Sequence, residues 1–179
     1  RHRLRAGAAR VPFALPLGGP MMGYGARAGG ARGVHDPLFA RALYLAEGGE
    51  CLWLELDLCL LARSQADTIR SRVAERIGGL LRRVVVACTH THSGPETGLF
   101  AALGGVPTPP AAARLLDAAA AGAARARAAA GPARLGVGRA EARIGRNRRV
   151  ADGPLDPELG VVRVDSEGGG PLAVLYIHG

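Results

Sequence analysis

The sequence contains no lysine, and this absence defines how the chain carries its positive charge. All 23 of its basic residues are arginines, which outnumber the 15 acidic residues and give a formal net charge of +8. The arginines are scattered, without aromatic residues between them, so they do not predict a specific nucleic-acid-binding surface. Two interpretations remain: contact with phosphates or an anionic membrane surface, or a compositional bias toward Ala, Arg and Gly.

Aromatic residues and long apolar runs are also scarce. Phe, Tyr and Trp make up 4% of the 179 residues, so the core has to be built mainly from Leu, Val, Ile and Ala. No apolar run approaches the roughly 20 residues that a membrane-spanning helix needs, which predicts a chain without a transmembrane segment. No secretory segment is visible, and the cellular location stays open. The length suits one domain or a piece of a larger one.

Cysteine is limited to three positions, Cys51, Cys59 and Cys88, which cannot all pair within one chain. All three lie in or beside predicted strands, and their spacing matches no zinc–cysteine pattern. We therefore expect reduced, buried thiols.

Apolar periodicity predicts an α/β fold with a mixed, partly parallel sheet flanked by helices. In the predicted strand 51–60 the even-numbered residues are all leucines, so one complete face should be buried against helices. Ser64 and Asp67 resemble a capping box for a helix that would connect this strand to a parallel neighbour at 84–88. The predicted strands are 5–11, 39–45, 51–60, 84–88, 133–144, 159–164 and 172–177, and the predicted helices are 64–77 and 109–130.

The strand 84–88 runs directly into Thr-His-Thr-His-Ser-Gly-Pro at residues 89–95. In an extended segment, side chains two residues apart point the same way, so His90 and His92 should face one site. Open α/β sheets bind ligands at the carboxyl ends of their strands, and a pair of imidazoles suits a divalent metal, most often zinc. The alternative, a hydrogen-bonded histidine pair in a turn, stays open.

Three other features have two interpretations each. Asp57, near the end of a predicted strand, is either a salt-bridged structural carboxylate or a group that supports a metal site. His35 beside Asp36 is favoured as a structural pair over a site residue, because it lacks metal-ligand spacing. The glycine-rich segment 16–33, which includes Tyr24, is either a loop that lines a site or a plain surface loop.

Several short motifs follow one another in an order that resembles the neutral/alkaline (non-lysosomal) ceramidase family. The most specific is Thr-His-Thr-His-Ser-Gly-Pro, and the resemblance runs over essentially the whole chain. Glu96-Thr97 replaces the usual glycines and Arg149 replaces a serine, which indicates a divergent, bacterial-type member. The other motifs are Met21-Met22-Gly23-Tyr24, Gly33-Val34-His35, Leu38-Phe39-Ala40-Arg41-Ala42, Leu56-Asp57-Leu58, Asn147-Arg148-Arg149 and His178-Gly179.

The resemblance implies a zinc amidase that splits the N-acyl bond of a sphingolipid, in a family whose members are often secreted or membrane-peripheral. It also implies that residues 1–179 are the amino-terminal part of a zinc hydrolase domain. A glutamate and a tyrosine that ligate zinc, together with a catalytic serine, would then lie downstream. We expect this fragment alone to be inactive or nearly so, because two zinc ligands are too few for a catalytic site.

The resemblance also implies a role for individual residues. His90 and His178 would be zinc ligands, and His92 would point toward the substrate or the attacking group and move a proton. Arg148 would hold the amide oxygen or the reacting hydroxyl. Without the resemblance, Arg148 would be interpreted as a surface salt-bridge partner and His178 as a chain-end histidine without a role. The residues expected to bind substrate or to support the ligands are Tyr24, His35 and Asp57.

Two other functions stay open. The first is a different metal hydrolase on the same scaffold, with a non-ceramide amide or ester as its substrate. The second is a non-catalytic, truncated relative that binds acidic partners through its arginines, in a salt-sensitive manner.

Overall fold

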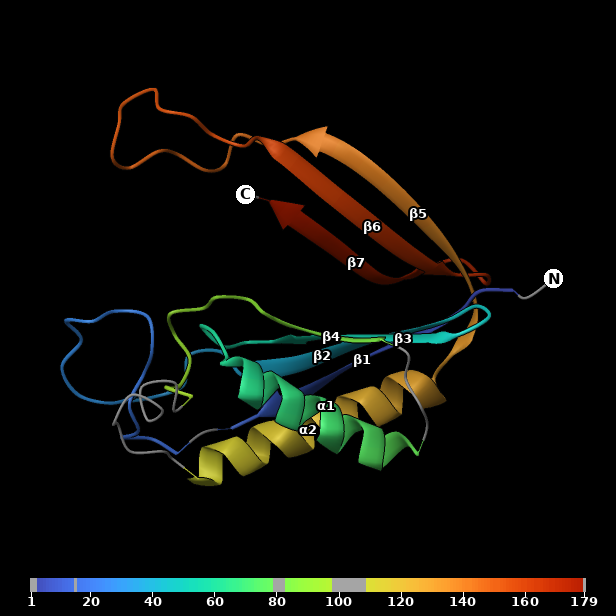
Figure 1. Cartoon of the computed structure of the whole chain (residues 1–179), viewed down its shortest axis with the longest axis horizontal. Helices are drawn as coiled ribbons and strands as arrows, with labels where there is room; N and C mark the ends of the chain where they lie inside the picture. The colour runs from blue at the N-terminus through green and yellow to red at the C-terminus, as the bar shows by residue number, and fades with distance from the viewer. Residues whose placement is uncertain (1–2, 15, 79–82, 98–108, 179) are drawn as a thin grey trace.

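The computed structural model describes residues 3–14, 16–78, 83–97 and 109–178 (Figure 1). The strands in these ranges form one mixed sheet in the order β4-β3-β2-β1-β5-β6-β7, in which only β3 and β4 are parallel. The predicted α/β fold with a partly parallel sheet is therefore confirmed. The elements are β1 (Arg5–Phe13), β2 (Leu38–Ala46), β3 (Glu50–Leu56), α1 (Arg63–Ile77), β4 (Arg83–Cys88), α2 (Pro109–Ala128), β5 (Gly131–Glu141), β6 (Glu158–Ser166) and β7 (Pro171–His178).

The elements stack in three layers (Figure 1). Both helices lie against one face of β1–β4, and the strands β5–β7 lie over the opposite face. The sheet can bend between these layers because β1 and β5 share only the register pairs Arg5–Pro132 and Ala6–Gly131. The prediction of a sheet flanked by helices is thus refined, since the second flank of β1–β4 is made of strands.

The main core lies between β1–β4 and the two helices. Leu52, Leu54 and Leu56 of β3 are 0% exposed, as the alternating pattern predicts for a face buried against helices. They pack in one cluster with Ile69 and Val73 of α1, which recur at helical spacing. The predicted burial of the leucine face is therefore confirmed in β3, and Leu58 after the strand is also 0% exposed in this cluster.

β3 ends at Leu56, four residues earlier than predicted for the strand 51–60. The amide of Leu58 donates to the carbonyl of Leu56 at 2.8 Å, which turns the chain out of the extended conformation. The predicted alternation of faces through residue 60 is wrong for this reason. Cys59 consequently sits in a loop, where it is 3% exposed.

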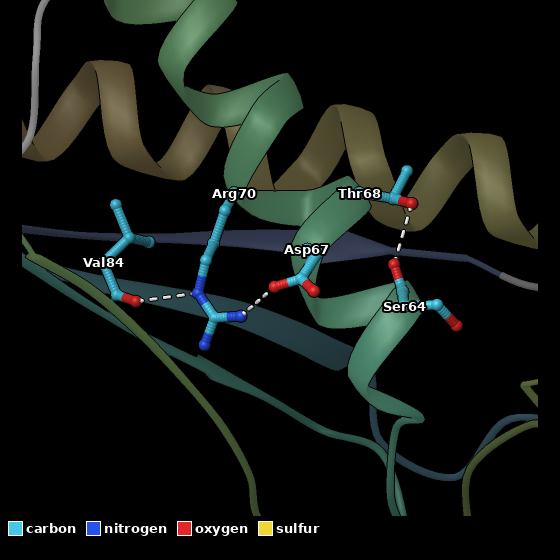
Figure 2. Close-up of polar contacts among 5 residues, drawn as sticks. All are labelled: Ser64, Asp67, Thr68, Arg70 and Val84. Atoms are coloured by element: carbon cyan, nitrogen blue, oxygen red, sulfur yellow. Dashed lines mark hydrogen bonds and ion pairs between the residues drawn. The ribbon is translucent and has the colours of Figure 1, made fainter.

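The start of α1 also differs from the predicted capping box (Figure 2). The carboxylate of Asp67 accepts from Arg70 Nη1 at 2.7 Å, and Arg70 Nε donates to the carbonyl of Val84 in β4 at 3.0 Å. The helix is instead preceded by Ala62, whose amide donates to Gln65 Oε1 at 2.8 Å. Asp67 therefore helps to hold α1 against β4 and does not cap its amino end.

The three cysteines are free thiols, as expected, but only Cys59 is buried; Cys51 and Cys88 are half-buried, so the expected burial is wrong for these two. Within the described ranges, neither helix combines the length and the apolar character that crossing a membrane requires.

The loops that carry the predicted site residues gather at one end of the molecule, at the left of Figure 1. They are the segments 16–37, 57–62, 89–97 and 142–157, together with the carboxyl end of β7. This end is also where the parallel pair β3 and β4 terminates, because Leu56 is paired with Cys88.

At the other end of the sheet, away from these loops, a polar cluster joins β2 and β3 to the helices. Tyr44 donates its hydroxyl to Glu50 Oε1 at 2.6 Å, and Arg127 of α2 donates to the same oxygen at 2.9 Å. Arg127 also donates to the carbonyl of Ile77, the last residue of α1, at 2.6 Å. The Tyr44 hydrogen bond is the largest effect that lowers the pKa of Glu50 below its usual value.

We predict that Glu50→Gln lowers the free energy of unfolding by about 1–2 kcal/mol at neutral pH, because hydrogen bonds to a charged acceptor are lost. A carboxyl with a lowered folded-state pKa stabilises above its unfolded pKa, and this contribution disappears as the pH falls through the folded value. The difference between the two proteins should therefore vanish well below pH 4. Urea unfolding across this pH range measures it, with the exposed Glu141→Gln as control; a pH-independent difference would contradict the prediction.

Candidate metal centre

His90 is held in a defined orientation immediately after β4. Its backbone has a φ of 60°, so the chain turns as soon as the strand ends. The ring nitrogen Nδ1 lies 2.7 Å from the carbonyl oxygen of Cys59. A carbonyl can only accept, so Nδ1 carries a proton, and in the neutral imidazole Nε2 then keeps a lone pair. Metal-binding histidines usually show this arrangement, in which the other ring nitrogen donates to an oxygen.

Cys59, His90 and His92 form the one cluster of potential metal ligands found within the described ranges. One ligand atom from each residue lies within 4.8 Å of the others. The two imidazole rings are 5.0 Å apart, and Cys59 Sγ lies 3.8 Å from His90 Nδ1. Sulfur and imidazole nitrogen are the donors that zinc prefers, and three protein ligands leave a fourth position open. The two histidines thus lie together as predicted, but the predicted reason is wrong: β4 ends at Cys88 and the chain turns at His90, so the segment is not extended.

The glycine-rich loop lines this cluster, with Tyr24 beside His92. The two rings lie 4.8 Å apart in an edge-on contact. Arg27 donates to the carbonyl of His92 at 2.8 Å, and its guanidinium lies 5.0 Å from the centre of the Tyr24 ring. The amide of Met22 donates to the carbonyl of Gly94 at 3.2 Å. Of the two interpretations of this segment, residues 22–27 therefore fit the loop that lines a site.

Gly23 lets the loop approach His92 this closely. Its φ of 115° lies in a region that side chains disfavour. A Cβ atom at this position would lie 2.3 Å from Cγ of His92. The position therefore requires glycine for conformation and for space.

Asp57 is an ion-paired carboxylate at the edge of a large cavity. It accepts from the amide of Phe39 at 2.8 Å and from Arg41 Nη1 at 2.6 Å, and its side chain is 13% exposed. The hydrogen bond between Asp57 and Arg41 raises the pKa of Arg41. The cavity has a volume of about 860 Å³ and extends to Thr91 and Ser93, next to the histidines. The salt-bridge interpretation of Asp57 agrees with these contacts.

His35 forms the structural pair favoured from the sequence. Its Nδ1 lies 2.7 Å from Asp36 Oδ2, and the hydrogen bond raises the pKa of His35. The imidazole is 97% exposed and lines the same cavity. The structure does not bring it into the Cys59–His90–His92 cluster.

Arg148 and His178 lie in the other sheet layer and are not part of the cluster. Arg148 is exposed in the loop between β5 and β6, where Asn147 Oδ1 accepts from the amide of Arg149 at 3.0 Å. The ring nitrogen Nε2 of His178 lies 2.7 Å from the carbonyl of Ala142. Figure 1 places both segments at the same end of the molecule as the loop after β4. Their roles in metal and substrate binding stay predictions.

Two residues of this site were missed by the sequence-based reasoning, Cys59 and Arg27. The carboxyl ends of adjacent parallel strands meet at one sheet edge, so residues that follow β3 should lie beside residues that follow β4. This signal could have drawn attention to Cys59. No comparable signal identifies Arg27, because its contacts depend on the loop conformation.

Fold and site together define an α/β protein with a candidate transition-metal centre at the carboxyl edge of two parallel strands. The sequence matches no known family model.

Two solved structures share its fold. The neutral ceramidase from Pseudomonas aeruginosa superposes with a TM-score of 0.85 over 98% of this chain, at 22% sequence identity. A ceramidase complexed with C2 superposes with a TM-score of 0.83 over 98% of this chain, at 21% identity. The chain spans 31% of the length of each of these structures. The resemblance to ceramidases seen in the sequence is therefore confirmed at the level of the fold.

We predict that Gly23→Ala displaces the loop from His92 and lowers the free energy of unfolding by about 1–3 kcal/mol, the usual range for a strained backbone position. Urea unfolding measures the loss, and the NMR signals of the His92 ring should shift. Gly25→Ala is the matched control, because a Cβ there meets no atom within 4 Å. Equal effects of the two substitutions would contradict the steric explanation.

Arg27→Met should loosen the contact between the loop and the histidine segment. Loss of the hydrogen bond to His92 is worth about 1–1.5 kcal/mol, so the amide of Met22 should exchange with solvent about tenfold faster. Hydrogen exchange followed by NMR measures this change. The exposed Arg32→Met serves as control for the loss of one charge; unchanged protection of Met22 in Arg27→Met would show that Arg27 does not hold the loop.

Proposed function

We propose that the protein containing this chain is a zinc-dependent amide hydrolase that cleaves the N-acyl bond of a sphingolipid or a similar N-acyl substrate. The observation that supports this proposal best is the oriented histidine cluster, in a chain whose fold is that of neutral ceramidase over 98% of its length. The chain covers 31% of that structure, so the remaining catalytic groups would come from other parts of the protein.

The donor chemistry of the cluster fits zinc. His90 offers Nε2 because its Nδ1 is bonded to the carbonyl of Cys59 at 2.7 Å. Zinc, when bound, would polarise the substrate carbonyl and lower the pKa of a bound water to about 7. We propose His178 as a second ligand, following the resemblance. It lies on β7, and its Nε2 is hydrogen-bonded to the carbonyl of Ala142.

The residues around the cluster have chemically distinct roles in this proposal. His92 lies beside His90, with its ring 5.0 Å away, and can accept or donate a proton near neutral pH. Arg27 and Tyr24 fix the position of His92 through the contacts described above. Arg148, on the exposed loop between β5 and β6, would donate to the oxygen on which negative charge develops.

The cavity next to the histidines suits an amphiphilic substrate. Its lining includes Met21, Phe39 and Val34, which are apolar, and the ion pair of Arg41 with Asp57. Binding sites for small molecules combine an apolar surface with a few polar groups in this way. The divergence of residues 96–97 and 149 from the ceramidase pattern favours, as second candidate, the same reaction on a different amide or ester.

We expect the full-length protein to hydrolyse N-acyl substrates, and Arg148→Ala to lower kcat by about 100- to 1000-fold, the usual cost of removing one donor to a developing oxyanion. Arg149→Ala, the adjacent exposed arginine, should retain activity. Steady-state kinetics with N-acylsphingosine and a short N-acyl amide measure these effects and separate the two substrate candidates. Hydrolysis that persists after removal of zinc with a chelator would contradict the proposal.

A further inference from the structure

An apolar pocket, called the helix pocket below, lies between the amino-terminal halves of α1 and α2. It has a volume of about 120 Å³. These side chains belong to the main core or pack against it, so the pocket is a gap at one end of that core. Its apolar walls are formed by Phe13, Leu58, Leu61, Ile69, Leu115 and Leu116.

Three of the four polar side chains that line the helix pocket are bonded within the protein. Gln65 accepts from the amide of Ala62 at 2.8 Å and donates to the carbonyl of Thr97. The hydroxyl of Thr97 donates to a backbone carbonyl in the loop after β3 at 3.2 Å. Thr68 donates its hydroxyl to the carbonyl of Ser64 at 2.9 Å (Figure 2). Because these donors are already used, the pocket suits a ligand without polar groups, such as a hydrocarbon chain.

The helix pocket adjoins the large cavity next to the histidines, because Phe13 and Pro95 line both spaces. Pro95 is held in place by an antiparallel bridge to Met21. Glu96, the fourth polar residue of the pocket, donates its amide to the carbonyl of Pro20 at 2.9 Å. The ring of Phe13 is 5% exposed. The boundary between the two spaces is therefore apolar.

We propose that the helix pocket receives the end of the acyl chain of the substrate, so that residues of α1 and α2 set the preference for chain length. This inference rests on the proposed function, because it takes the substrate to be an N-acyl compound. A chain in the large cavity, with its carbonyl group at the histidines, enters the pocket by passing Phe13 and Pro95. The pocket is somewhat smaller than the roughly 150 Å³ cavity that binds benzene, so it holds only the last few carbons.

The test measures how kcat/KM of the full-length protein depends on acyl length, with saturated amides from N-acetyl to N-hexadecanoyl. A buried methylene contributes about 0.8 kcal/mol, so each carbon that enters the pocket should raise kcat/KM about fourfold. Ala112→Phe, at an exposed position that lines the pocket, should fill it and remove this rise. Ala113→Phe is the matched control, because Ala113 is equally exposed on α2 and does not line the pocket; it should retain the rise.

Methyl NMR of the full-length protein tests binding without hydrolysis. Alkanoates of increasing length should shift the methyl signals of Ile69 and Leu115 once the chain is long enough to enter the pocket. The same shifts should occur in Ala113→Phe and be absent from Ala112→Phe. Shifts that do not depend on chain length would overturn the pocket assignment.

The outcomes separate this inference from the proposed function. Hydrolysis whose dependence on acyl length is the same in Ala112→Phe and Ala113→Phe overturns the pocket assignment and leaves the proposed hydrolase intact. The same holds if Ala112→Phe alters only the dependence on the length of the amine part. Length-dependent methyl shifts in a protein that hydrolyses no N-acyl substrate support a pocket for alkyl chains and contradict the proposed function. A folded protein with neither shifts nor hydrolysis overturns both.

Discussion

The parallel pairing of β3 with β4 is the constraint on which the site depends. The pair ends in register at Leu56 and Cys88, so the segments that follow both strands emerge side by side. One segment carries Cys59 and the other carries His90, and the hydrogen bond between them follows from this adjacency. The leucine face of β3 and the helix α1 hold the pair in place through the main core. Burial of apolar side chains thus supplies the rigidity that an oriented ligand set requires.

The glycine-rich loop packs against the segment that carries His90 and His92. Its backbone reaches the histidine segment because Gly23 has no side chain and adopts a positive φ. Arg27 then joins the two segments through the carbonyl of His92. Residues at this end of the molecule, including Thr91 and Ser93, line a cavity of about 860 Å³. A substrate in this cavity would lie next to the candidate metal ligands. The glycine-rich loop thus forms one side of the candidate site.

The sequence predicted the parts of the fold that depend on periodicity and on short connections. The alternation of leucines located β3, and the amphipathic helix between two apolar strands predicted the parallel pair with β4. Cys59 was missed because the alternation continues in the sequence beyond Leu56, while hydrogen bonds of Leu58 and Thr89 to Leu56 end the strand. Such strand ends are decided by tertiary contacts, which a local pattern does not contain. Arg27 was missed for the same reason, because its contacts arise only after the loop has folded.

A metal is expected to bind at the Nε2 side of His90. Anomalous diffraction at the zinc edge, from crystals of the full-length protein grown with zinc, tests it most directly. We expect a peak within bonding distance of His90 Nε2, about 2.0–2.1 Å for a zinc–nitrogen bond. A peak located elsewhere, for example at His35 and Asp36, or the absence of any peak near His90 would contradict it.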